Sequence, residues 1–211
     1  MKTGRWIRSS IFLLLLAGSA WSVGGCTFGE AEISPVTRNQ AELRQIHTIA
    51  VLPFIDAPGA QAKGSGAVVV NAITTQLYPC RGVKVVERSR VSSLMQERDL
   101  HVSQMQDTSV ATEIGKLAEA DAVLVGSLTQ YEAQQDYSHG AVYVVSGGGT
   151  KHMHRVGISV RLVDVHTGQV LFAEDAGGKD KEGFAQAAKI AAGRAIKPLR
   201  DFYEIERGPK Q

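Results

Sequence analysis

The sequence predicts an α/β fold with a mixed sheet, in which helices pack on the sheet and its C-terminal half is antiparallel. Short apolar runs of strand length alternate with segments whose apolar residues recur at helical spacing. From residue 156 the pattern changes to alternating apolar and polar residues followed by a glycine turn, as in a β-hairpin. The predicted order of elements is β-α-β-α-α-β-β-β-α.

The first half of the predicted domain alternates strands with helices. Residues 48–54 form an apolar strand with Pro53 near its end, where a missing backbone donor is tolerated. Residues 66–78 form a helix, because Val69, Ile73 and Leu77 recur at four-residue spacing. The other elements expected here are a strand at 83–86, a helix capped by Ser89 that carries Val91, Leu94 and Met95, a helix that carries Val110, Ile114 and Leu117 and ends near Ala120, and a strand at 122–125.

The second half begins with a strand that has one buried and one solvent-exposed face. Its pattern is the alternation of Val156, Ile158, Val160 and Leu162 with Gly157, Ser159 and Arg161. Gly168 supplies the positive-φ position of a turn, and residues 169–174 resume the strand. An alanine-rich helix over about 181–203 should kink or end near Pro198, which lacks a backbone donor. The domain is expected to span residues 46–203, followed by a polar tail at 204–211.

The first 25 residues have the order of a bacterial lipoprotein signal peptide. Lys2, Arg5 and Arg8 precede an apolar run, and small residues lead to Gly24, Gly25 and Cys26. Cleavage after Gly25 would leave Cys26 as the lipidated first residue. The strongly apolar part spans only about 7 to 10 residues, whereas a spanning helix needs roughly 20, so an uncleaved membrane anchor is disfavoured.

A lipidated Cys26 determines where the protein would work. A diacylated, N-acylated cysteine carries several acyl chains such as palmitate, which hold a protein at a membrane stably. Thr27 follows the lipid site where inner-membrane lipoproteins often carry Asp, so by resemblance to sorted bacterial lipoproteins the destination is the periplasmic face of the outer membrane. The polar residues 26–45 are expected to form a lipidated tether.

Composition excludes several classes of partner once the signal is removed. The signal holds three of the 23 basic residues and none of the 21 acidic ones, so the formal charge falls from +2 to about −1. No charge argument remains for nucleic acid or for an anionic membrane surface. With Cys26 lipidated, Cys80 has no partner for a disulfide within the chain and is expected to be a buried apolar residue.

Several segments together resemble the CsgG-type lipoproteins, the family of the curli production assembly/transport component. The matching segments, in order, are the strand Ile-Ala-Val-Leu-Pro-Phe at 49–54, Val-Val-Glu-Arg at 85–88, Leu-Met-Gln-Glu-Arg at 94–98, Ala-Asp-Ala-Val-Leu-Val-Gly-Ser at 120–127 with Tyr131 and Glu132, and Val-Arg-Leu-Val-Asp-Val-His-Thr-Gly at 160–168. The resemblance covers about residues 47–175. It implies a periplasmic α/β domain anchored under the outer membrane, which assembles into homo-oligomeric rings and, in the curli case, forms a secretion pore from hairpins of every subunit.

Length decides how many membrane hairpins the chain offers. Each needs roughly 20 residues plus a turn. Residues 136–151 provide one candidate, whose apolar part is Ala141, Val142, Tyr143, Val144 and Val145. Its alternation is imperfect, so membrane insertion and a mobile periplasmic loop are both retained. In pore-forming relatives a second hairpin precedes the last helix, whereas here residues 176–182, Ala-Gly-Gly-Lys-Asp-Lys-Glu, are too short for one.

Two patterns suggest chemistry but are incomplete. Gly64-Ser65-Gly66 resembles part of a dinucleotide-binding loop, yet Val69 stands at the third glycine position, so a loop and helix start is favoured. His152 and His154 share one strand face but lack further metal ligands, which favours solvated histidines, with pH sensitivity as the alternative. We therefore expect no enzyme activity, no cofactor and no metal.

Two functions follow from these expectations. The first is a self-assembling outer-membrane component of a periplasmic assembly or secretion apparatus, with a secreted or envelope protein as partner. The second is a periplasmic accessory lipoprotein that forms no pore, comparable to polysaccharide-export ring lipoproteins or to activators of peptidoglycan synthases. The missing second hairpin favours the second mechanistically, while the run of matching motifs favours the first as a family assignment.

Overall fold

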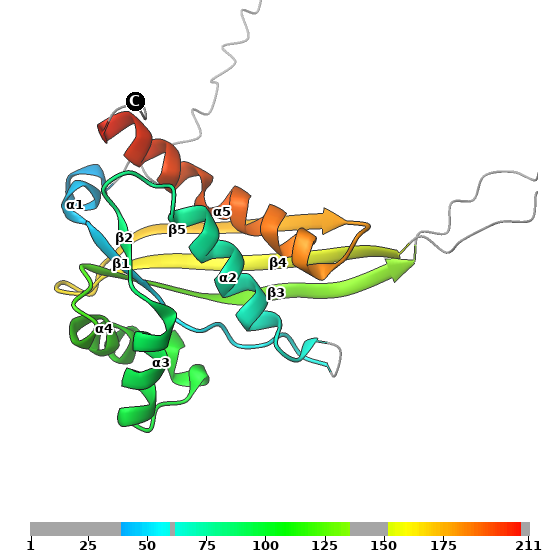
Figure 1. The fold of residues 1–211 in the computed structure, drawn as a ribbon, viewed down its shortest axis with the longest axis horizontal. Coiled ribbons are helices and arrows are strands. Elements are labelled where there is room, and N and C mark those ends of the chain that lie inside the picture. Colours follow the sequence, from blue (N-terminus) through cyan, green and yellow to red (C-terminus); the bar gives the residue numbers. More distant parts are fainter. Residues whose placement is uncertain (1–38, 60–61, 136–151, 208–211) are drawn as a thin grey trace, which may run out of the picture. The chain divides into compact units, whose positions relative to one another are not determined.

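A five-stranded mixed sheet forms the centre of the domain (Figure 1). The computed structural model describes residues 39–59, 62–135 and 152–207. Its strands are β1 (Thr48–Val51), β2 (Lys84–Val85), β3 (Ala122–Gln135), β4 (His152–Asp164) and β5 (Val170–Asp180), in the spatial order β2-β1-β3-β4-β5. β1 is parallel to β2 and β3, whereas the pairs β3–β4 and β4–β5 are antiparallel. The predicted fold class is confirmed.

Helices cover the sheet from both sides (Figure 1). One side packs against α2 (Ser65–Leu77) and α5 (Phe184–Arg207), and the other against α3 (Arg88–Glu97), the 3₁₀ turn η3 (Val102–Gln106) and α4 (Thr108–Leu117). A short helix α1 (Gln40–Gln45) precedes β1. The two sides have separate hydrophobic cores, because successive residues of a strand point to opposite faces.

The alanine-rich sequence of α5 lets this helix approach the sheet closely. Five of its alanines have no solvent exposure, namely Ala187, Ala188, Ala191, Ala192 and Ala195. The closest approach is at Gly178 of β5, where an added Cβ atom would lie 1.9 Å from the carbonyl oxygen of Ala187. Small residues on both elements therefore hold α5 directly against β5.

The pairing of β3 with β4 contains a register shift between Leu128 and Gln130. Leu128 lies opposite Ile158 and Gln130 opposite Gly157, so Thr129 is an extra residue in β3, a β-bulge. The partner has to be small, because a Cβ atom on Gly157 would lie 2.6 Å from Oγ1 of Thr129. Beyond the bulge Tyr131 pairs with buried Val156 and faces α5, whereas its neighbours Gln130 and Glu132 are exposed.

The structured domain starts earlier than predicted. α1 occupies residues expected to form the tether, and its Leu43 is completely buried. The side-chain amide of Asn39 donates a 2.9 Å hydrogen bond to the carbonyl of Leu171, which attaches this segment to β5. The last residues of the predicted tether, up to residue 45, therefore pack as part of the domain.

The domain also ends later than predicted. α5 runs through Pro198 to Arg207, so part of the expected polar tail is helical. Packing outweighs the missing donor, because Leu199 and Tyr203 beyond the proline are fully buried and the Tyr203 hydroxyl donates to the carbonyl of Leu43. The predicted cap at Ser89 was also wrong, since α3 begins at Arg88 and Glu87 holds the N-cap position.

The turn between β4 and β5 is formed as predicted. Gly168 has a φ of +70°, and the carboxylate of Asp164 accepts hydrogen bonds from the backbone N–H groups of His166 and Thr167. This side chain fixes the turn while the glycine supplies the left-handed position.

Candidate functional site

The residues singled out from the sequence for membrane contact lie outside the described ranges. They are Gly25 and Cys26 at the predicted cleavage and lipidation site, and Ala141, Val142, Tyr143, Val144 and Val145 in the predicted hairpin. The structure does describe the two strands on either side of residues 136–151. β3 and β4 remain paired up to Gln135 and His152, which is the last pair before that segment.

An aromatic cluster stands near this end of the β3–β4 pair. The ring of Tyr131 stacks on Phe184, the first residue of α5, with centroids 4.0 Å apart and an interplanar angle of 10°. His154 of β4 meets the same phenyl ring edge-on at 4.7 Å. Partial burial, with a smaller contribution from the Asp56 carboxylate, raises the pKa of the Tyr131 hydroxyl. The start of α5 is thus attached to the strands that lead into residues 136–151.

The two histidines differ in their surroundings. His152 is exposed, as expected for a solvated side chain, whereas His154 is half-buried against Phe184 and its Nδ1 atom has no hydrogen-bond partner. The expectation of two solvated histidines is therefore wrong for His154, because β4 extends further than its apolar alternation indicated. Within the described ranges, no three His, Cys, Asp or Glu side chains gather as a metal site requires.

The connection from β5 to α5 is short. β5 continues to Asp180 and α5 begins at Phe184, so residues 181–183 make the whole link. The segment 176–182, which the sequence analysis judged too short for a hairpin, instead forms the end of β5 and the first two residues of the link. Its Gly178 is in contact with α5, as described above.

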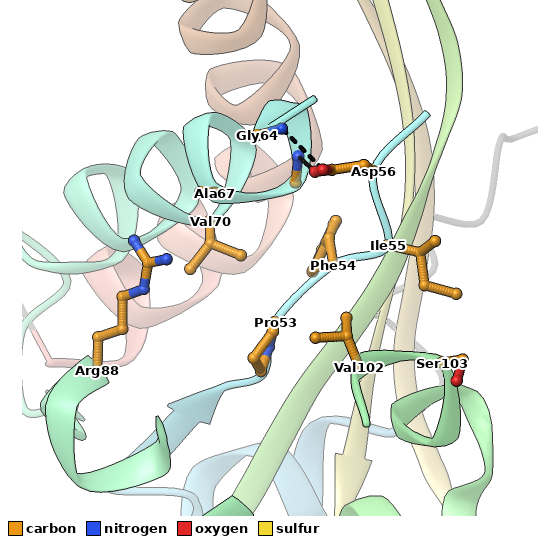
Figure 2. A pocket seen from close by; sticks show the side chains of 11 residues that line it. Pro53, Phe54, Ile55, Asp56, Gly64, Ala67, Val70, Arg88, Val102 and Ser103 are labelled. Atoms are coloured by element: carbon orange, nitrogen blue, oxygen red, sulfur yellow. Dashed lines mark hydrogen bonds between the residues drawn. The ribbon is translucent and has the colours of Figure 1, made fainter. Parts of the chain in front are cut away.

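The N-terminus of α2 carries a built-in carboxylate at the position where a dinucleotide site would hold phosphate. Asp56 accepts hydrogen bonds from the backbone N–H groups of Gly64 at 2.7 Å and Gly66 at 2.8 Å (Figure 2). Gly64 has a φ of +83°, and a Cβ atom on Gly66 would lie 2.1 Å from the Phe54 carbonyl oxygen. The two glycines thus serve a capped helix start, and the donors that would bind phosphate are already engaged.

A pocket of about 320 Å³ adjoins this helix start (Figure 2). The loop after β1, the first two turns of α2, the first residue of α3 and the start of η3 surround it. The lining residues are Pro53, Phe54, Ile55, Asp56, Gly64, Gly66, Ala67, Val70, Arg88, Val102 and Ser103. Sequence reasoning missed this pocket because its residues come from four separated segments, although Arg88 belongs to one of the motifs noted above.

Two other residues from the sequence analysis have structural roles. The Asp121 carboxylate accepts 2.8 Å hydrogen bonds from the backbone N–H groups of His47 and Thr48, which joins the start of β1 to β3. Cys80 is buried with a free thiol, as predicted, and burial raises its pKa to about 11. Neither residue belongs to the pocket or to the aromatic cluster.

Comparison with protein families gives a match over most of the chain. Residues 36–195 match the family described as "Curli production assembly/transport component CsgG". The chain belongs to the CsgG family. The match begins before α1, so the family domain includes the helix that the sequence analysis assigned to the tether. No curated protein sequence matches the chain.

Solved structures place this CsgG-family chain among known folds. PelC from Paraburkholderia phytofirmans, a dodecamer in its crystal, is 14% identical with a TM-score of 0.50, covering 78% of this chain and 89% of PelC. Lipoprotein GNA1162 from Neisseria meningitidis is 18% identical with a TM-score of 0.45, covering 63% of this chain and 82% of that protein. The LpoB C-terminal domain from Escherichia coli is 15% identical with a TM-score of 0.36, covering 68% of this chain and 96% of the domain.

Among residues 39–59, 62–135 and 152–207, no helix combines the length and the apolarity that crossing a bilayer takes.

Proposed function

We propose that this CsgG-family protein is an outer-membrane lipoprotein that assembles with copies of itself on the periplasmic face and serves as a scaffold for a secreted or envelope protein partner. In this proposal Cys26 carries the lipid anchor and the α/β domain makes the contacts between copies. The role is binding rather than catalysis. The acid that lines the described pocket, Asp56, is already engaged by two backbone N–H groups.

The observation that favours a scaffold function over a pore function is the short junction between β5 and α5. Three residues separate Asp180 from Phe184, and Gly178 contacts the first turns of α5, so the chain passes from the sheet straight into the helix. A barrel built from many subunits needs enough strands to close, because open sheet edges do not occur in the hydrocarbon region. With one candidate hairpin per subunit, each subunit would supply two strands to such a barrel, half the number that two hairpins would supply.

Self-association is supported by the likeness to PelC, which crystallised as a dodecamer. The likeness covers most of both chains but at low identity, so ring formation here is part of the proposal. Repetition of one heterologous contact closes a ring when the rotation between neighbours divides a full turn.

The test combines particle size with conductance. The full-length lipidated protein is extracted in mild detergent, examined by mass photometry and negative-stain microscopy, and added to a planar lipid bilayer. Rings that do not conduct are expected. Monomers at micromolar concentration would overturn self-assembly, and stable single-channel conductance would overturn the scaffold in favour of a pore.

A pore with one hairpin per subunit is the second candidate, because β3 and β4 stay paired up to Gln135 and His152, next to the predicted hairpin. Deleting residues 138–149 should abolish conductance if this candidate is correct, and a Gly-Ser replacement of equal length separates sequence from length. Under the scaffold proposal both variants keep the same ring size. Cys26→Ser tests the anchor alone, since a variant that still fractionates tightly with the outer membrane would contradict lipidation as the attachment.

A further inference from the structure

The pocket in Figure 2 occupies a specific place in the sheet topology. After β1 the chain enters α2 on one face of the sheet, and after the neighbouring parallel strand β2 it enters α3 on the opposite face. Such a reversal leaves a crevice beyond the carboxyl ends of the two strands, where open α/β sheets bind ligands. The pocket is lined by Pro53 and Phe54, which follow β1, and by Arg88, which begins α3 after β2, so it lies in this crevice.

Most of the pocket wall is apolar. Phe54, Val70 and Val102 surround its interior, and Ala67 and Pro53 complete the wall (Figure 2). Its volume of about 320 Å³ lies at the lower end of the range for small-molecule sites. A branched aliphatic or small aromatic group fits this lining.

The charge in the pocket comes from Arg88. Its Nη1 atom donates a 3.0 Å hydrogen bond to the Asn71 side chain, and within the described ranges no carboxylate forms an ion pair with it. Asp56 also lines the pocket, but its two oxygens accept the backbone N–H groups of Gly64 and Gly66 at the start of α2 rather than an ion pair from Arg88. The pocket therefore combines an apolar interior with a guanidinium that keeps donors available.

We propose that this pocket binds a monocarboxylate with a branched apolar body, whose carboxylate pairs with Arg88 and whose body lies between Phe54, Val70 and Val102. A guanidinium matches the two oxygens of a carboxylate in a forked geometry. A nucleotide is disfavoured, because Asp56 occupies the helix N-terminus that would bind its phosphate. The same chemistry is found in a free small acid and in the C-terminal leucine of a peptide, so the experiment has to separate these sources.

The test uses methyl NMR of the full-length lipidated protein in mild detergent. The probes are isocaproate and its amide, and N-acetyl-leucyl-leucine and its C-terminal amide. At least one of the acids should shift the methyl signals of Val70 and Val102, and its amide should bind about tenfold more weakly or worse. Binding of the peptide acid alone would identify a polypeptide C-terminus as the source, and equal or better binding of isocaproate would identify a free small acid.

Variants make the test specific. Arg88→Gln should weaken binding of the acid about tenfold or more and leave the amide unchanged, whereas Arg90→Gln, two residues along α3 and outside the pocket lining, should have no effect. Ala67→Phe should fill the pocket and abolish binding, with the Ile158 methyl signals reporting that the core is intact. Equal affinity of acid and amide, unchanged binding in Arg88→Gln, or no shift with any probe would overturn the proposal.

Discussion

The phenyl ring of Phe184 lies flat on the phenol ring of Tyr131, with centroids 4.0 Å apart and planes inclined by 10°. Phe184 is the first residue of α5, and Tyr131 belongs to the part of β3 that leads to residues 136–151. This stack therefore connects the longest helix of the domain to the strands that flank the predicted hairpin.

Replacing the two stacked rings should reveal a coupling between them. In a double-mutant cycle with Tyr131→Leu and Phe184→Leu, we expect a coupling free energy of about 0.5–1.5 kcal/mol, because leucine keeps apolar contact but loses the ring geometry. Urea unfolding of the four proteins measures it. The exposed Ile205→Ala variant serves as the control and should change stability little. Additive single-mutant effects would contradict an energetic role for the stack.

Two adjacent glycines of β5 should differ in how much the same substitution destabilises the domain. Gly178→Ala should destabilise the domain by about 3 kcal/mol, since the new Cβ atom would overlap the Ala187 carbonyl oxygen of α5. Gly177→Ala should change stability by less than about 1 kcal/mol, because its Cβ atom would have only one neighbour, at 3.9 Å. Denaturant unfolding compares the two variants, and equal losses would mean that α5 does not contact β5 closely at this point.

The Cys80 thiol should be unreactive in the native protein. In the Cys26→Ser background it is the sole thiol of the chain, and burial raises its pKa from 9.0 to about 11. At pH 8 a thiol reagent should label it quickly only after denaturation. Rapid labelling of the native protein would show that α2 and α5 open readily around it.

The same pKa shift predicts a pH dependence of stability. Above pH 9 the thiol of the unfolded chain loses its proton while the folded thiol keeps it, so the free energy of unfolding should fall between about pH 9 and pH 11. Below pH 9 the Cys80 thiol is protonated in both the folded and the unfolded state, so its pKa shift no longer lowers the free energy of unfolding. Cys80→Ala removes this component, and its difference from the parent protein across that range isolates it.

The ion pair between Arg44 and Glu206 joins the two ends of the domain, which lie outside the bounds predicted from the sequence. The guanidinium of Arg44 donates to both carboxylate oxygens of Glu206, at 2.8 and 2.9 Å, and joins α1 to the last turn of α5. The hydrogen bond from Arg44 lowers the pKa of Glu206 below 4.5. The ion pair should therefore stabilise the folded state above pH 4.5, and this stabilisation should disappear as the pH falls and Glu206 becomes protonated.

Glu206→Gln should consequently lower the thermal midpoint at pH 7 and differ less from the parent protein at pH 3. Glu204→Gln, two residues earlier on the same helix, is the control and should leave this pH dependence unchanged. High salt should reduce the difference at pH 7, because the pair is exposed to solvent. A difference that is constant with pH would mean that Glu206 acts through packing rather than through its charge.

The order of the elements could be predicted because the cores on both faces leave regular patterns in the sequence. Val69, Ile73 and Leu77 of α2 are all buried, as their spacing indicated. The outer parts of β3 and β4 were missed because Gln130, Glu132 and Gln134 are exposed there, and a face without a covering layer gives no apolar period. α1 was missed because six residues with one buried leucine give no period either.

The pocket could not be predicted for a different reason. Pro53, Gly66, Arg88 and Val102 are brought together by the crossing of α2 and α3 to opposite faces of the sheet, a property of the topology rather than of any local pattern. A signal did exist in Arg88, which stands two residues after the strand predicted at 83–86, in the region where open α/β sheets place their binding residues. The continuation of α5 through Pro198 escaped prediction because tertiary packing of Tyr203 overrides the local preference.

The extra residue Thr129 marks a place where the length of this chain can change without turning a strand over. Deletion of Thr129 would leave Leu128 opposite Ile158, Gln130 opposite Gly157 and Tyr131 opposite Val156, so Tyr131 would still meet Phe184. Residues 136–151 follow the last pair of the ladder, so insertions there also leave the facing of Tyr131 unchanged. Descendants of this gene should therefore tolerate loss of Thr129 and changes of length between Gln135 and His152, whereas a single deletion between Ala122 and Gly126 would exchange the two faces of β3.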